Sequence, residues 1–263
     1  MRWSAKRSGP RGSSRVREPL ARPCSAPGAL SGWTPWASHA WARSTSTCSA
    51  GEIVGVAGVG GNGQDELVAC AAGLVAPIAG TIAFDGSDLT GRSTSRFREA
   101  GVGYVSADRG EEGLCLAASI RDNFVAGRER EPAFSRFGFL RRAAIDAEAQ
   151  RALIRLSVRF GALGDPAGSL SGGNQQRLAI ARELEREPKL LVAALTRGVD
   201  IGGTAFIHGL IAAFRDRGSA VLLVSESLDE ILAVSDRVVC LYKGRIIGEV
   251  DRARRRASTG SGV

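Results

Sequence analysis

Seven residues that follow a short apolar run have the types and spacing of a phosphate-binding loop. The apolar run covers 53–57, and a helix is expected to begin directly after the loop. Glycines let the backbone turn tightly, so that successive N–H groups and the positive end of the following helix converge on an anion. The candidate nucleotide-binding residues are Gly58, Gly60, Gly61, Asn62, Gly63, Gln64 and Asp65. A tight turn with no ligand is the structural alternative.

The glycine spacing fits two different nucleotide sites. Gly58, Gly60 and Gly63 satisfy GxGxxG, the dinucleotide fingerprint. Asp85 follows 22 residues after Gly63, near where the acid that binds the ribose is expected. The same loop satisfies the GxxxxG of a P-loop, but Gln64 and Asp65 replace the expected Lys and Ser or Thr. Gln64 brings no charge, which removes on the order of 4 kcal/mol of attraction for phosphate at an effective dielectric of 20. The loop alone does not decide between these chemistries.

A second stretch, LSGGNQQR at 170–177, is far more specific. Ser171 is a good helix N-cap, and Gly172 and Gly173 let a ligand approach the free N–H groups of the helix that follows. Here the chain resembles the signature of ATP-binding cassette (ABC) ATPases, LSGGxQQR. The resemblance implies that Ser171, Gly172, Gly173 and Asn174 bind the γ-phosphate of ATP held by another cassette. An ordinary loop before a capped helix is the structural alternative.

The resemblance extends over 51–250, nearly a whole cassette. The apolar run at 188–195 takes the place of the Walker B strand, and TRGVD at 196–200 is similar to the TRGLD of sugar-type cassettes. YVSADR at 104–109 and the Gly-Leu pair at 113–114 are similar to the YVPEDR and GL of the same importers. Within the family, the chain looks closest to the second, degenerate cassette of a sugar- or nucleoside-type importer.

Several groups that this family uses for phosphoryl transfer are absent. The resemblance implies a Mg²⁺-binding acid and a water-polarising glutamate at the end of Walker B, where this chain has Ala194 and Leu195. The glutamine of the Q-loop and the histidine of the switch loop are replaced by Ala107 and Glu226. Together with the missing P-loop lysine, these losses predict a domain that does not hydrolyse ATP by itself. We expect no catalytic residue and no metal ligand of its own.

The resemblance also implies partners, because cassettes of this family pair head to tail. This chain would complete the active site of a second, intact cassette, with Asp200 helping to line the interface. The implied cofactor is ATP, with Mg²⁺ supplied mainly by the partner's site. Transmembrane permease subunits and, indirectly, a substrate-binding protein are the other implied partners. The implied location is peripheral, on the cytoplasmic face of the plasma membrane.

The elements that must position these motifs indicate an α/β fold. From Gly51 onward, short apolar strands alternate with amphipathic helices, which is typical of a mostly parallel sheet covered by helices. The resemblance adds a P-loop NTPase-like cassette with a helical signature subdomain at about 115–187. Strands are expected at 53–57, 81–84, 102–105, 190–194, 220–224 and 237–241, with a closing hairpin that turns at 243–244 into 245–250.

Charge and composition set the start of the chain apart from this fold. Residues 1–48 hold eight basic residues against one acid and so carry +7 of the net charge of +8. They also hold all four tryptophans, yet they have neither helical nor strand periodicity. We expect a non-domain segment, disordered or wrongly framed, with a transit peptide or a basic arm as alternatives. The cassette then covers 49–250, and 251–263 form a short basic tail.

Other features narrow the function classes. No apolar run approaches the roughly 18 to 20 residues that cross a bilayer. Residues 49–263 carry a net charge of only +1, which argues against nucleic acid as a partner. Five scattered cysteines and two distant histidines argue against a metal cluster or a disulfide framework. Two rival interpretations remain: a dinucleotide-dependent oxidoreductase, which leaves 170–177 unexplained, and an inactive cassette kept as an interaction module.

Overall fold

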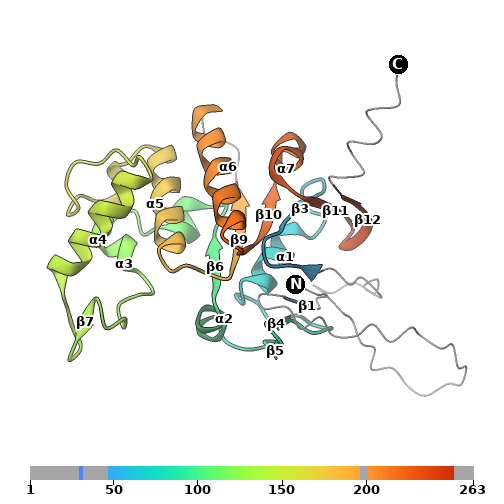
Figure 1. Cartoon of the computed structure of the whole chain (residues 1–263), viewed down its shortest axis with the longest axis horizontal. Coiled ribbons are helices and arrows are strands. Elements are labelled where there is room, and N and C mark those ends of the chain that lie inside the picture. Colours follow the sequence, from blue (N-terminus) through green and yellow to red (C-terminus); the bar gives the residue numbers. More distant parts are fainter. Residues whose placement is uncertain (1–29, 32–46, 196–200, 252–263) are drawn as a thin grey trace, which may run out of the picture.

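A six-stranded sheet with the order β12-β11-β3-β10-β9-β6 forms the centre of the computed structural model, which describes residues 30–31, 47–195 and 201–251 (Figure 1). Its strands are β3 (Ile53–Ala57), β6 (Val102–Val105), β9 (Leu190–Leu195), β10 (Ala220–Ser225), β11 (Arg237–Tyr242) and β12 (Arg245–Asp251). All neighbours pair in parallel except β11 and β12, which form an antiparallel hairpin. The mostly parallel α/β class expected from the sequence is confirmed.

The central strands are almost entirely apolar because helices cover both faces of the sheet. Every residue of β3, β9 and β10 is buried. Side chains alternate between the faces, so Leu222 packs in one core cluster and Leu223 in another. The first cluster also contains Leu67 and Val68, and the second contains Phe214.

Helices and short elements complete the described fold. The α-helices are α1 (Gln64–Ala71), α2 (Thr94–Ala100), α3 (Ile120–Val125), α4 (Arg142–Arg155), α5 (Gly172–Leu184), α6 (Ile201–Asp216) and α7 (Leu228–Val234). A π-helical turn, η1 (Arg109–Gly113), and a 3-10 turn, η2 (Ala167–Ser169), lie between them. A small sheet joins β2 (Thr47–Cys48), β1 (Leu30–Ser31), β4 (Ala83–Phe84) and β5 (Ser87–Asp88), and β7 (Ser135–Arg136) pairs with β8 (Phe139–Leu140).

Helices α3, α4 and α5 gather at one end of the molecule, away from the β11–β12 hairpin (Figure 1). They share a core of their own, which includes Phe124, Leu153 and Leu178. Most of this core lies within 115–187, the span in which a helical subdomain is expected, but Leu114 belongs to it and Phe206 and Leu210 of α6 pack against it. The division into domains stays a prediction. Among the described residues, no helix is both long and apolar enough to cross a bilayer.

The strand predictions agree with the structure to within one residue, except at 81–84. There β4 covers only Ala83–Phe84. The prediction is too long because Ile82 N–H donates to Thr90 Oγ1 at 2.8 Å, and Ile82 O accepts from Leu89 N–H at 2.7 Å. The backbone of Ile82 is therefore bonded to a loop.

Two strands lie inside the segment that shows no periodicity in sequence. Leu30–Ser31 pairs with both Thr47–Cys48 and Ala83–Phe84. Strands of two residues are too short to produce a visible alternation, so the lack of periodicity in 1–48 does not reveal these two strands. Cys48 is fully buried, and its Sγ lies 3.4 Å from Val221 O.

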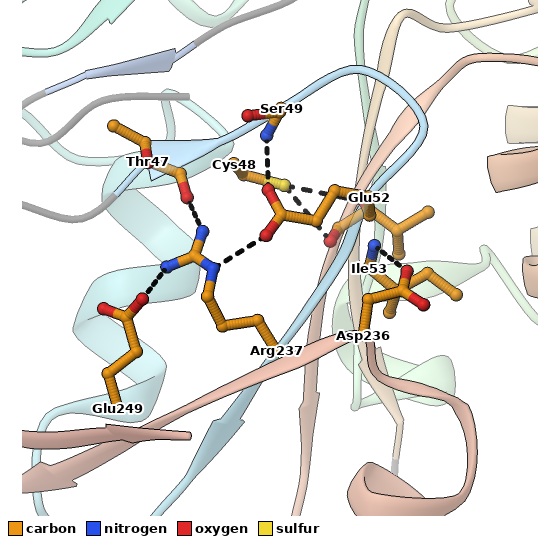
Figure 2. Close-up of polar contacts among 9 residues, drawn as sticks. Thr47, Cys48, Ser49, Glu52, Ile53, Asp236, Arg237 and Glu249 are labelled. Carbon is orange, nitrogen blue, oxygen red and sulfur yellow. Dashed lines mark hydrogen bonds and ion pairs between the residues drawn. The ribbon is translucent and has the colours of Figure 1, made fainter. Parts of the chain in front are cut away.

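A buried arginine fastens this early segment to the last strands, as Figure 2 shows. Arg237 Nε donates to Glu52 Oε1 at 2.7 Å, and its Nη1 donates to Glu249 Oε1 at 2.9 Å. Its Nη2 donates to Thr47 O. Burial alone would lower the pKa of Arg237, but the two carboxylates raise it above the ordinary value. The network therefore ties the residues before β3 to β11 and β12.

Candidate functional site

The glycine-rich loop runs from the end of β3 to the start of α1. Gly61 and Gly63 have φ angles of 80° and 102°, in the left-handed region that favours glycine, and Gly63 is the N-cap of α1. The loop rests on the β11–β12 turn, where Lys243 N–H donates to Asn62 Oδ1 at 2.8 Å and Gly244 N–H donates to Asn62 O at 2.7 Å. The predicted strand-loop-helix arrangement is present.

Gln64 folds back into this loop. Its Oε1 accepts from Asn62 N–H at 3.1 Å, its Nε2 donates to Val59 O at 3.0 Å, and the residue is only 9% exposed. A Cβ at Gly58 would lie 2.5 Å from Gln64 Nε2 and 2.8 Å from Leu241 O, so only glycine fits there. The carboxamide thus accepts the hydrogen bond of Asn62 N–H, which is then not available to a phosphate oxygen.

The outer part of the loop stays open. A Cβ at Gly60 or Gly61 would meet nothing within 4 Å, and Asp65 is exposed on the first turn of α1. Lys243 gives the loop its backbone N–H, but its ammonium lies 5.4 Å from the centroid of the Tyr242 ring. The loop can approach an anion through Gly60 and Gly61, whereas Gln64 supplies no positive charge.

The signature residues lie at the exposed N-terminus of α5. Ser171 is the N-cap by position, but its side chain accepts no backbone N–H; its Oγ accepts from Asn174 Nδ2 at 3.0 Å. Asn174 Oδ1 in turn accepts from Arg159 N–H at 3.1 Å. The expected side-chain cap is therefore wrong, because Asn174 orients this hydroxyl instead. Ser171 and Gly172 are exposed, and a Cβ at Gly173 would meet nothing within 4 Å.

These two groups of residues are built on different parts of the fold. The loop residues 58–65 lead into α1, whose Leu67 and Val68 pack in a core with the main sheet. The signature residues 171–174 begin α5, whose Leu178 packs in the core with α3 and α4. Each group therefore presents its own helix N-terminus as a separate surface for a ligand.

The end of β9 is apolar, as the sequence implies. Ala194 and Leu195 are 8% and 6% exposed and pack in the cores on either side of the sheet. Asp200, like the rest of 196–200, lies outside the described residues. Glu226, at the expected switch position, is exposed after β10, while Ala107 packs half-buried against the core. Neither strand end gives this part of the chain a buried carboxylate for a metal ion.

Two contacts near these motifs are missing from the sequence interpretation. Asn62 binds a turn that is 181 residues away, and only the Lys243-Gly244 hairpin signal pointed to that turn. Ser225 Oγ donates to Glu230 Oε2 at 2.6 Å, and this pair fixes the start of α7, next to Glu226. Neither contact has a local sequence signal.

Asp85, the acid of the dinucleotide interpretation, has a structural role in this fold. It lies in the turn between β4 and β5 with a φ of 50°, and its Oδ2 accepts from Lys189 Nζ at 2.7 Å. The ion pair ties the small sheet to the residue just before β9. The oxidoreductase interpretation is therefore not favoured.

Comparison with known proteins gives a consistent result. Residues 42–193 match the model of a family described as "ABC transporter". The Nucleoside import ATP-binding protein NupA of Lactococcus lactis is 42% identical over 202 residues, which cover 76% of this chain and 40% of that protein. The Ribose import ATP-binding protein RbsA 2 of Rubrobacter xylanophilus is 43% identical over 204 residues, 77% of this chain and 39% of that protein. The chain thus spans about two fifths of the length of these relatives.

Solved structures agree on the fold. The ATP-binding cassette MJ1267 superposes with a TM-score of 0.69 at 18% identity, over 86% of this chain and 91% of that one. The ATP-binding cassette MJ0796, in a dimeric structure with ADP and Pi, gives a TM-score of 0.68 at 19% identity, over 85% of this chain and 98% of that one. At these identities the likeness concerns the fold, and it confirms the expected cassette.

Proposed function

Because this chain belongs to the ABC transporter family, we propose that it acts as an ATP-binding unit of an importer for simple sugars or nucleosides. The printed functions of the relatives, nucleoside import and ribose import, support that substrate range. The proposed working unit is the cassette at 49–250, with a helical subdomain at about 115–187. Thr47 and Cys48, just before it, pack against this unit.

We further propose that this unit is a degenerate half-site. The main support is the position of Gln64, whose carboxamide accepts from Asn62 N–H inside the loop and has no positive charge. A phosphate can enter only if that side chain leaves, and no positive charge then replaces the missing lysine. The ends of β9 and β10 add no buried carboxylate for Mg²⁺ or for a water molecule. Hydrolysis by this chain alone is therefore not expected.

The signature surface is the part of the site that remains fit for nucleotide. Ser171 and Gly172 are exposed at the N-terminus of a 13-residue helix, whose positive dipole end attracts anions. Asn174 holds the Ser171 hydroxyl in one orientation. In a head-to-tail pair, this surface would contact ATP and Mg²⁺ held by a second, intact cassette.

The partners follow from this role. A separate transmembrane permease would convert closure of the two cassettes into transport, and a substrate-binding protein would deliver the sugar or nucleoside to it. The chain would then lie on the cytoplasmic face of the plasma membrane as a peripheral subunit. An inactive cassette that serves only assembly is the alternative function.

The test combines the isolated chain with its native complex. The purified full chain should release no phosphate from Mg-ATP, and a complex captured through a tag on this chain should contain a permease and hydrolyse ATP. Gly173→Asp should abolish turnover by the complex, because a carboxylate would then face the γ-phosphate. Gly164→Asp is the matched control, since Gly164 is exposed and a Cβ there also meets nothing within 4 Å.

Each outcome decides one part of the proposal. Phosphate release by the isolated chain would contradict the half-site. Full turnover in the Gly173→Asp complex would contradict the role of the signature surface and favour the assembly module. A soluble complex without a permease would contradict the importer.

A further inference from the structure

The hairpin β7–β8 projects from the helical end of the molecule, at the lower left of Figure 1. Ser135 pairs with Leu140 and Arg136 with Phe139, so Phe137 and Gly138 form the turn. The base of the hairpin is anchored, because Phe134 is 1% exposed and its carbonyl accepts from Arg141 N–H at 2.7 Å. The tip is therefore held in place by a packed base.

The tip carries large apolar side chains that the fold does not use. Phe137 is 87% exposed, Phe139 is 79% exposed and Leu140 is 45% exposed. Phe137 and Gly138 have φ angles of 52° and 81°, as in a two-residue turn where asparagine or glycine is the low-cost first residue. A phenylalanine at this left-handed position is strained. It thus adds strain and exposed apolar surface without stabilising the folded chain.

The charge around the tip has one sign. Between residues 132 and 145 the sequence contains Arg136, Arg141 and Arg142 and no acid. All three arginines are exposed. The guanidinium of Arg136 lies 5.3 Å from the centroid of the Phe137 ring. The tip therefore combines aromatic rings with cations.

The acids nearest in sequence are already bonded elsewhere. Glu131 and Glu148 both bind the buried guanidinium of Arg128, at 3.0 Å and 2.9 Å. Asp146 binds Arg121 through two hydrogen bonds. These carboxylates balance other cations, so they leave the positive charge of the tip largely uncompensated.

We propose that this hairpin docks onto an anionic lipid surface, with Phe137 and Phe139 entering the headgroup region and the arginines binding lipid phosphates. Exposed apolar patches with a polar rim mark interaction sites, and apolar side chains next to cations are the combination that binds anionic membrane interfaces. A protruding tip suits a soft surface that closes around it. A folded protein partner would need a matching pocket. This docking is independent of nucleotide and of the proposed importer.

The effect of each residue type can be estimated. An arginine near an anionic bilayer contributes about fivefold to the partition coefficient at physiological ionic strength. A phenylalanine that loses most of its exposure contributes roughly tenfold. Removing both rings should therefore weaken binding more than removing any one cation, and only the charge effect should disappear at high salt.

The test measures co-sedimentation of the full chain with vesicles of phosphatidylglycerol and phosphatidylcholine, and with vesicles of phosphatidylcholine alone. Because residues 1–48 are themselves basic, variants are compared within the same full chain. Phe137→Asn with Phe139→Asn should reduce partition onto the mixed vesicles at least tenfold. Asparagine at 137 suits the turn, so thermal unfolding should not fall because of that change. Ile78→Asn, which replaces another exposed apolar residue, should leave partition unchanged.

The charge is tested separately. Arg141→Gln with Arg142→Gln should lower partition onto mixed vesicles about 25-fold, and Arg92→Gln with Arg217→Gln, a matched loss of two exposed cations, should change it far less. Unchanged partition in the double asparagine variant would overturn the proposal. Equal binding of the native chain to both kinds of vesicle would overturn the choice of an anionic surface. Loss of permease association with unchanged vesicle binding would mean that the hairpin contacts a protein.

Discussion

Gln64→Lys should change nucleotide affinity and fold stability in opposite directions. In the native chain, Gln64 makes two hydrogen bonds to its own loop, of about 1 kcal/mol each. An incoming phosphate must displace at least the bond to Asn62 N–H. Lysine removes that obstacle and adds a cation, worth at most about 4 kcal/mol at 4 Å and an effective dielectric of 20. We take half of this value because the outer loop is exposed at Gly60 and Gly61.

The net gain in binding free energy is then about 2 to 3 kcal/mol, or roughly 30- to 150-fold in the dissociation constant for Mg-ATP. The free protein should lose about 1 to 2 kcal/mol of unfolding free energy, because both loop hydrogen bonds are gone. For a chain of this size the loss lowers Tm by about 2 to 8 °C. Titration calorimetry and thermal unfolding of the purified full chain measure the two effects.

Two further variants at position 64 separate the causes. Gln64→Ala frees Asn62 N–H without adding a charge, so affinity should rise only about fivefold, with the same loss of stability. Gln64→Glu keeps the acceptor and adds a negative charge, so affinity should fall below that of the native chain. Equal affinities for the lysine and alanine variants would show that the loop does not lack a cation. Native affinity in both would refute the idea that the carboxamide blocks the loop.

Contacts around the main sheet provide three further tests. Arg237→Met should lower the free energy of unfolding by about 2 kcal/mol in chemical denaturation, because it leaves Glu52 without its cation; a loss near zero would contradict a role for the network. Burial raises the pKa of the Cys48 thiol from 9.0 to about 12. The neutral thiol therefore makes its full contribution to the free energy of unfolding below pH 9, and that free energy falls by roughly 1.4 kcal/mol per pH unit between pH 9 and 12. In Cys48→Ala, the free energy of unfolding should change less with pH over this range. Gly55→Ala would place a Cβ 2.4 Å from Ile231 Cγ2, so the free energy of unfolding, measured by thermal unfolding, should fall by roughly 1 to 3 kcal/mol. Gly209→Ala, where a Cβ meets nothing within 4 Å, is the control and should not destabilise the fold.

Local patterns carried most of the fold prediction. Strands such as 102–105 and 220–224 are apolar runs between turn signals, and their boundaries depend on the residues themselves. The prediction is wrong where a backbone group bonds outside its own pattern. Ile82 bonds to the loop that follows it, and Leu30–Ser31 forms a strand only because Phe84 and Cys48 lie on either side of it.

In the candidate site too, local features are visible in the sequence and contacts between distant segments are not. The loop at 58–65 is visible in sequence because glycine spacing and a helix start are local features. That Gln64 lacks a charge is also visible, but its return to Val59 O depends on the left-handed turns at Gly61 and Gly63. The support from the Lys243-Gly244 turn is a contact between distant segments, and a single sequence does not contain it.

In the proposed half-site, the uncharged loop and the apolar end of β9 are physically coupled. A carboxylate at Ala194 would stand at the buried end of β9, in the same core cluster as Leu67 and Val68 of α1. Such a charge is tolerated when a metal ion or a lysine pairs with it, and it is strongly destabilising when unpaired. With the amide of Gln64 turned into the loop and no lysine at that position, the described residues of the loop offer no cation to an acid at β9. Alanine and leucine at 194–195 therefore suit a sheet end without a metal ion. The signature at Ser171 lies on α5, whose Leu178 packs in the core with α3 and α4 and whose Ile180 packs with Leu195 in a core of the sheet. Leucine at 195 therefore also supports the helix that carries the signature.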